Sequence, residues 1–118
     1  MTIKLMKSKV HRATVTGADL NYEGSIALDE ALIEAAGFVL GEAVHVWNIG
    51  NGERFETYVI PAPRGSGEVR LNGAAARLVA PGDLVIVVSF CWVDAAEAQT
   101  HSPRVVFVDE KNRVTKSQ

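Results

Sequence analysis

Apolar and polar residues alternate along several short stretches of the chain, the pattern of half-buried β-strands. These stretches are bounded by Gly, Pro, Asn and Asp, which favour turns. The strands predicted in this way are residues 3–16 (as one strand or two), 26–28, 43–49, 54–60, 68–71, 84–93 and 104–108. Short strands of this kind, without a repeat or an interdomain linker, predict a single mainly β barrel domain over residues 1–118.

Two brief helices interrupt the predicted strands. Asp29 is a suitable N-cap for a helix over residues 30–36, and Gly37 provides its C-terminal stop. A helical turn is expected within residues 94–99. The charged residues 110–118 follow the last predicted strand and are expected to form a mobile tail.

Between the third and fourth predicted strands, residues 50–52 include an Asn-Gly pair, which favours a two-residue hairpin turn. We expect Trp47 and Phe55, on either side of this turn, to be core residues. Residues 84–93 are the most apolar strand and are expected to be buried on both faces, with Cys91 as an inert core residue.

Composition narrows the classes of partner and compartment. With 118 residues, of which 47% are hydrophobic, the chain can bury a real core. Its formal net charge of −2 gives no basic excess for nucleic acid or an anionic membrane. A single cysteine excludes an internal disulfide, and neither a signal peptide nor a run of about 20 apolar residues is visible. We therefore expect a cytoplasmic, soluble protein without nucleic-acid or membrane partners.

The step from Gly24 to Ser25 lies between two apolar runs, where a tight and exposed turn is expected. Gly24 has no Cβ, so it can take backbone angles closed to other residues and leave its carbonyl open to attack. The Ser25 hydroxyl can reach that carbonyl, and a shift of the acyl group from nitrogen to oxygen would turn the amide into a labile ester. An ordinary turn is the alternative, because Gly and Ser are common turn residues.

Two other stretches carry candidate chemistry. Lys9 and His11 lie on the same face of the first predicted strand, because side chains alternate. They form either a solvated face or a wall that binds anions or handles protons. The small residues within 72–78 would let backbone amides approach a ligand closely, and a helical turn there would aim N–H groups at an anion. The alternative is a plain connector.

Six segments form a set in fixed order and spacing. They are Lys9-Val10-His11-Arg12, Ala18-Asp19-Leu20-Asn21-Tyr22-Glu23-Gly24-Ser25, Trp47-Asn48 with Asn51-Gly52, Arg54-Phe55-Glu56-Thr57-Tyr58, Asn72-Gly73-Ala74-Ala75-Ala76 and Pro81-Gly82-Asp83. Each segment is a weak signal alone, but the set covers nearly the whole chain and resembles the aspartate 1-decarboxylase family, the pyruvoyl-dependent enzymes of pantothenate biosynthesis. The resemblance implies a double-psi β-barrel with short helices, assembled as a homotetramer with active sites between neighbouring subunits. The one departure is a short tail after the last strand, outside these segments.

The same resemblance implies that the chain is a proenzyme. Self-cleavage between Gly24 and Ser25 would give a β chain (1–24) and an α chain (25–118), with Ser25 converted to a covalent pyruvoyl cofactor. That ketone would form a Schiff base with L-aspartate and accept the electrons left on the α-carbon when CO2 departs to give β-alanine. Whether cleavage is spontaneous or assisted by a maturation factor stays open.

The family pattern also suggests roles for individual residues. Thr57 would stabilise the negative oxygen formed during self-processing and contact the substrate, and Tyr58 would donate the proton to the α-carbon. Arg54 suits the retained carboxylate because its planar fork matches two oxygens, and Lys9 offers a second positive charge. The other residues expected to bind substrate are His11, Tyr22, Asn72, Gly73, Ala74 and Ala75.

Two other functions compete with this interpretation. A non-catalytic β-barrel that binds a partner or serves as a scaffold would stay intact and form no β-alanine. A metal hydrolase is disfavoured because His11, His45 and His101 lack ligand spacing, so no metal site is predicted.

Overall fold

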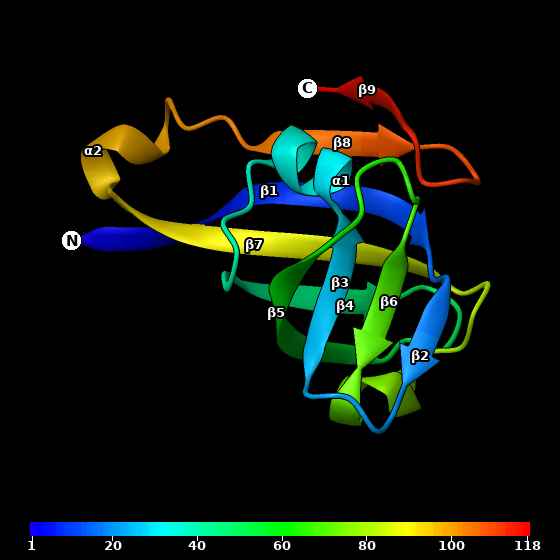
Figure 1. The fold of residues 1–118 in the computed structure, drawn as a ribbon. Coiled ribbons are helices and arrows are strands. Elements are labelled where there is room, and N and C mark those ends of the chain that lie inside the picture. The colour runs from blue at the N-terminus through cyan, green and yellow to red at the C-terminus, as the bar shows by residue number, and fades with distance from the viewer.

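Nine strands form one sheet in the order β2-β6-β3-β5-β4-β7-β1-β8-β9 in the computed structural model, which describes residues 1–118 (Figure 1). The strands are β1 (Thr2–Thr14), β2 (Gly17–Asp19), β3 (Ser25–Asp29), β4 (Ala43–Asn48), β5 (Arg54–Ala62), β6 (Val69–Asn72), β7 (Leu84–Asp94), β8 (Arg104–Val108) and β9 (Val114–Ser117). The helices are α1 (Glu30–Ala36), the 3-10 helix η1 (Gly73–Leu78) and α2 (Ala95–Ala98). The mainly β prediction is therefore confirmed. None of these helices has the length and apolar character needed to cross a membrane.

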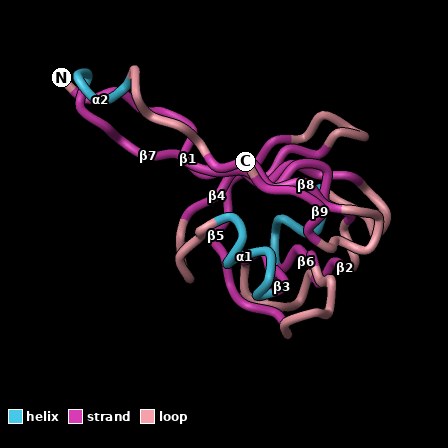
Figure 2. Tube along the Cα trace, turned by 90° about the horizontal axis from the view of Figure 1, so that it is seen from above, coloured by secondary structure: helices cyan, strands magenta, loops and turns pink.

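The sheet curls on itself (Figure 2). Its buried apolar side chains form one cluster. Its members include Val10 of β1, Leu28 of β3, Val44 of β4 and Val87 of β7, all fully buried. The alternation along β4 follows the predicted pattern, with Val44 and Val46 buried and Ala43, His45 and Trp47 more exposed. The period-two pattern therefore sets which side of the sheet forms the core.

The neighbours of β3 decide what surrounds the Gly24–Ser25 step. β3 runs parallel to β5, with Ile26 opposite Val59, and antiparallel to β6, with Ser25 opposite Asn72. β6 also pairs with β2, a short strand that is not among those predicted from the sequence. Ser25 is thus set between two strands that come from later parts of the chain.

The first half of β1 and the last half of β7 pair with each other and extend out of the barrel as an arm, with α2 near its tip (Figure 2). On this arm Trp92 is 69% exposed and Cys91 is only half-buried. The prediction that residues 84–93 are buried on both faces is therefore wrong beyond Ser89, because no second layer of the same chain covers the arm.

The prediction of a mobile tail is also wrong. β9 pairs with β8, and Asn112 just before it is only 2% exposed. The Asn112 side chain accepts from the Thr14 amide and donates to the carbonyls of Thr14 and Gly67, each at 2.8 Å. One buried amide therefore holds this segment to the barrel, although β9 itself has only exposed side chains and no apolar pattern to reveal it.

The hairpin between β4 and β5 is longer than predicted. Residues 49–53 form its loop, with Gly52 at φ +76°, instead of a two-residue turn. The buried side chain of Asn48 accounts for this, because it donates to the Leu78 carbonyl at 3.1 Å and to the Asp83 carboxylate at 2.8 Å. The hairpin is thereby tied to the end of η1.

Asp29 is the N-cap of α1, as predicted, and Gly37 closes the helix in a left-handed conformation. The carboxylate is 4% exposed and accepts from the backbone amides of Ala31 (2.8 Å), Gly65 (3.0 Å) and Gly67 (2.9 Å). Burial alone would raise the pKa of Asp29, but these three donors, helped by the charge of Arg64, hold that pKa below its usual value.

We expect the substitution Asp29→Asn to lower the free energy of unfolding by about 2 kcal/mol at pH 7, because the amide is a poorer acceptor for three N–H groups. A carboxyl whose pKa is lowered by folding stabilises the protein above its unfolded pKa of about 4, and the effect fades as pH falls through the lower folded pKa. In urea unfolding at several pH values, the free energies of unfolding of the wild type and Asp29→Asn should therefore approach each other as the pH falls. Glu30→Gln, an exposed change on the same helix, serves as the control; an equal pH-dependent gap there would contradict the assignment.

Candidate active site

Ser25 is the first residue of β3 and is 1% exposed. Its Oγ accepts a hydrogen bond from Asn72 Nδ2 at 2.9 Å and donates to the Glu23 carbonyl at 3.4 Å. Asn72 is fully buried, and its Oδ1 has no hydrogen-bond partner. A buried hydroxyl and an unused acceptor therefore lie together at the start of β3, where unpaired polar atoms are costly unless they have another role.

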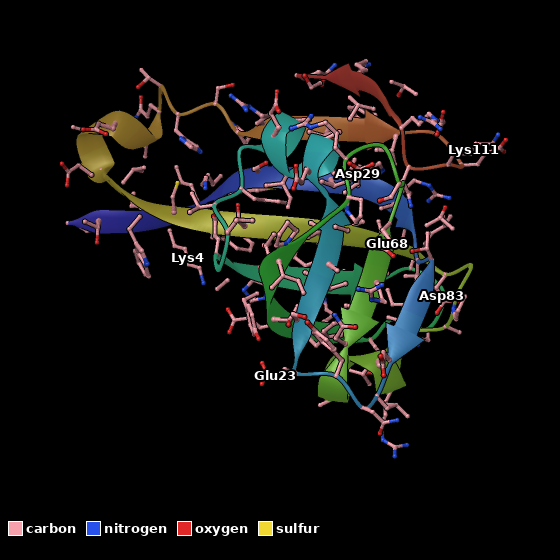
Figure 3. The ribbon with its side chains drawn as sticks, viewed as in Figure 1. Lys4, Glu23, Asp29, Glu68, Asp83 and Lys111 are labelled. Atoms are coloured by element: carbon pink, nitrogen blue, oxygen red, sulfur yellow. The ribbon has the colours of Figure 1, made fainter.

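Gly73 follows Asn72 and has φ +68°. A Cβ placed on it would lie 2.7 Å from Gly24 Cα, 2.8 Å from Gly24 N and 3.1 Å from the Tyr22 carbonyl oxygen, so only glycine allows this close approach. A Cβ on Gly24, by contrast, would meet nothing within 4 Å. The segment before Ser25 thus rests on the first residue of η1 and is open on its other side. Figure 3 shows Glu23 at this end of the barrel, beside the helix that follows β6.

Thr57 and Tyr58 lie on the other neighbour of β3. The parallel pairing begins with Ile26 opposite Val59, and Thr57 and Tyr58 immediately precede Val59 as Gly24 and Ser25 immediately precede Ile26. Tyr58 is 40% exposed and Thr57 is half-buried, consistent with side chains on opposite faces of β5. Both predicted residues are therefore close to the step along the strand.

Ala74 and Ala75 continue η1 after Gly73. The Asn72 side chain makes no capping hydrogen bond to this helix and turns instead to Ser25. The first amide groups of η1 therefore have no side-chain acceptor, a feature that suits binding of an anionic group.

Arg54 begins β5 and is exposed, with its Cζ 4.2 Å from the centroid of the Trp47 ring. The two residues are register partners on β5 and β4. Trp47 is only half-buried and lies outside the core cluster, so its prediction as a core residue is wrong, whereas Phe55 packs against that cluster. Sequence reasoning missed the contact between Trp47 and Arg54, although both residues flank the same hairpin.

Lys9 and His11 lie apart from the other candidates. Both are on β1, and β5, β4 and β7 intervene between β3 and β1 in the sheet. Figure 1 shows β1 far from the end of β3 at which Ser25 begins. A single chain therefore does not bring Lys9 or His11 to Ser25.

The His11 ring packs edge-on against Phe107, with the ring centroids 5.7 Å apart, and its buried Nδ1 has no partner. Partial burial lowers the pKa of His11, and the nearby charges of Lys9 and Arg12 lower it further. The neutral imidazole is therefore favoured, and it retains an unused ring nitrogen.

The hollows of the single chain lie elsewhere. One of about 530 Å³ is bordered by α1, β9 and Arg64, and another of about 250 Å³ by Lys7, Gly37 and His101. Neither is lined by Ser25 or by any other predicted site residue. No three His, Cys, Asp or Glu side chains are grouped so as to hold a metal ion. Ser25 therefore lies buried outside both hollows, with open space beside Gly24.

The model of the family described as aspartate decarboxylase matches residues 1–115. The chain belongs to the aspartate decarboxylase family. Among its curated relatives, the protein named aspartate 1-decarboxylase from Caldicellulosiruptor saccharolyticus is 59% identical over 98% of this chain and 91% of its own length. The one from Acetivibrio thermocellus is 60% identical over 97% of this chain and 90% of its own length. The family predicted from the six segments is confirmed.

A solved structure supports the fold of this aspartate decarboxylase family member. The rationally designed protein mkDPBB_sym_86, whose name abbreviates double-psi β-barrel, matches with a TM-score of 0.50 and 22% identity over 65% of this chain and 90% of its own. At this identity the likeness concerns the fold alone. The predicted double-psi β-barrel is confirmed.

Proposed function

We propose that the chain cleaves itself between Gly24 and Ser25, and that the product converts L-aspartate to β-alanine and CO2. The observation that carries the proposal is the buried Ser25 hydroxyl, held by Asn72 next to a glycine that has open space around it. Membership of a family whose curated relatives are named aspartate 1-decarboxylase supports the reaction class, a carboxy-lyase.

The cleavage chemistry is confined to two residues and one water molecule. Attack by Ser25 Oγ on the Gly24 carbonyl carbon forms a C–O bond, and the C–N bond between the residues breaks to leave an ester and an amine. Loss of the Ser25 Cα proton expels the Gly24 carboxylate from Cβ. Water then replaces the nitrogen, which leaves as ammonia, so residue 25 ends as a ketone. Thr57, two residues before Val59 on the neighbouring strand β5, would donate to the negative oxygen of the first step.

The surroundings of Ser25 fit a pyruvoyl group at that position. Asn72 Nδ2 can donate to an oxygen there, Asn72 Oδ1 has no other partner, and the bare backbone of Gly73 leaves room on one side. A pyruvoyl group supplies the electron sink that decarboxylation requires and that no encoded side chain offers.

The neighbouring residues would orient the substrate. The Arg54 guanidinium can hold the retained carboxylate with two parallel hydrogen bonds. The amides of Gly73, Ala74 and Ala75 at the start of η1 can bind an oxygen of the substrate, and the half-exposed Tyr58 of β5 can deliver a proton to the α-carbon. Tyr22, 53% exposed, would form part of the wall.

We further propose that the site is completed by a second copy of the chain within a homotetramer. Lys9 and His11 are remote from Ser25 in one chain, and no hollow of that chain contains Ser25. A neighbouring subunit that presents its β1 would add a positive charge and a neutral imidazole to the open side. Closure by that subunit would also exclude water, which strengthens the electrostatic contacts to the substrate.

The test is the intact mass of the purified wild-type protein, combined with an assay for β-alanine. We expect fragments 1–24 and 25–118, the larger one lighter than its sequence by one ammonia and blocked to N-terminal sequencing. L-Aspartate should be converted to β-alanine with release of one CO2. An unbroken chain that forms no β-alanine would instead support the non-catalytic barrel.

We also propose a place in pantothenate biosynthesis and a cytoplasmic location. Cleavage is either spontaneous or assisted by a maturation factor. Comparing cleavage of the purified chain in buffer alone with its cleavage in lysate distinguishes spontaneous from assisted cleavage.

A further inference from the structure

Trp47 and Arg54 form an isolated pair on the outward side of the sheet. The Arg54 guanidinium lies over the indole ring at 4.2 Å and makes no ion pair or side-chain hydrogen bond within the chain. Three other arginines are engaged through their donors: Arg64 and Arg70 contact glutamates, and Arg104 donates to a backbone carbonyl. Arg54 is therefore held by its face while its N–H groups stay free.

The indole is itself fixed in place. Trp47 is half-buried and lies between two register partners, Arg54 on β5 and Ile86 on β7. An exposed arginine loses rotamer freedom when it binds a carboxylate, and contact with a ring reduces that loss because the side chain is restricted beforehand. The ring also attracts the cation, most strongly when it is tryptophan.

We propose that Trp47 is a positioning residue for the substrate carboxylate. It holds the Arg54 guanidinium against the indole, so that the N–H groups of Arg54 stay free to bind a carboxylate. This inference rests on the proposed decarboxylase function and adds a residue that acts on the substrate only through Arg54. The competing explanation is that Trp47 merely covers apolar sheet surface, in which case its loss would affect folding but not substrate affinity.

The first test is Trp47→Leu, measured by steady-state kinetics. A cation–π contact of ordinary strength corresponds to about a two- to thirtyfold change, so we expect KM for aspartate to rise about tenfold. The kcat and the extent of cleavage should stay the same. Trp47→Phe keeps an aromatic ring that attracts a cation less strongly than indole does, so it should recover part of the lost affinity. Trp92→Leu makes the same change at the exposed tryptophan of the arm and should leave KM unaltered.

The second test separates action through Arg54 from direct contact. In an Arg54→Gln background, Trp47→Leu should cause no further change in KM or in the Kd for succinate, a dicarboxylate that lacks the amine. The same tenfold loss in that background would show direct contact with the substrate and overturn the proposal. So would an active Trp47→Leu enzyme with unchanged KM and succinate Kd.

Failure of the underlying function has a different signature. A wild-type protein that is neither cleaved nor able to form β-alanine overturns the proposed function, and this inference with it. An active wild type with an unaffected Trp47→Leu variant overturns the inference alone.

Discussion

Ser25→Ala should remain a single uncleaved chain and lose decarboxylation entirely, because it lacks the hydroxyl oxygen that attacks the Gly24 carbonyl and must leave Cβ before the ketone can form. The expected loss is at least about a million-fold, since only the uncatalysed reaction would remain. A denaturing gel and an intact mass report the cleavage, and formation of β-alanine reports the activity. The barrel should keep its fold, because the hydroxyl is small and its removal leaves the strand pairing in place, although Asn72 Nδ2 loses its acceptor.

Ser66→Ala is the matched control. Ser66 is an exposed turn residue whose hydroxyl accepts only from the Glu68 amide at 3.2 Å, so cleavage and activity should match the wild type. Fragments 1–24 and 25–118 obtained from Ser25→Ala would show that some other group cuts the chain and would refute the proposed chemistry.

Combining Ser25→Ala with Lys9→Ala tests whether one active site uses residues from two copies of the chain. Lys9→Ala and Ser25→Ala should each be inactive as homotetramers. In mixed tetramers, a site built from Ser25 of a Lys9→Ala subunit and Lys9 of a Ser25→Ala subunit is intact, so part of the activity should return. Mixed tetramers isolated with two affinity tags and found inactive would mean that both residues serve from the same chain.

Gly73→Ala should slow self-cleavage by about 100-fold, the second-largest effect expected. The added Cβ would lie 2.7 Å from Gly24 Cα and 2.8 Å from Gly24 N, which are backbone atoms and cannot rotate away. The cleavage segment must therefore shift by roughly 1 Å, and displacements of that size cost about two orders of magnitude in reactions that depend on orientation. The time course of fragment 25–118 on a denaturing gel measures the effect.

Gly52→Ala separates this clash from backbone strain. Gly52 has a similar positive φ of 76°, but a Cβ there meets nothing within 4 Å. We expect it to lower the free energy of unfolding by about 1 kcal/mol and to leave cleavage unaltered. Equal slowing in both variants would indicate general destabilisation instead of a local clash.

Local features of the fold could be predicted from the sequence. The alternation in β4 and β5 determined which residues face the core, and Asp29 and Gly37 marked the ends of α1. The sheet order could not be predicted, because Ser25 meets Asn72 across 47 positions and no local pattern says which strands pair. β9 was missed because its stability depends on the buried Asn112 and not on an apolar face.

In the candidate site, too, residue identities could be predicted from the sequence, whereas their contacts could not. The residues that share the β3–β6 edge, Ser25, Asn72 and Gly73, were named from the family pattern, but only the strand pairing shows that they touch. Trp47 was assigned to the core because large aromatic side chains are often buried. Its contact with Arg54 depends on the register of the hairpin, which loop length alone did not settle.

The proposed cut at the start of β3 would have a consequence for the refolding of the molecule. The piece ahead of it contains β1 and β2, and β1 lies between β7 and β8 with Val10 and Ala13 fully buried. A nicked barrel would therefore keep both pieces together without a covalent link. Once denatured, however, it would have to reassemble from two separate partners, and the serine that began the reaction would no longer exist. Such a protein would fold as one chain only once.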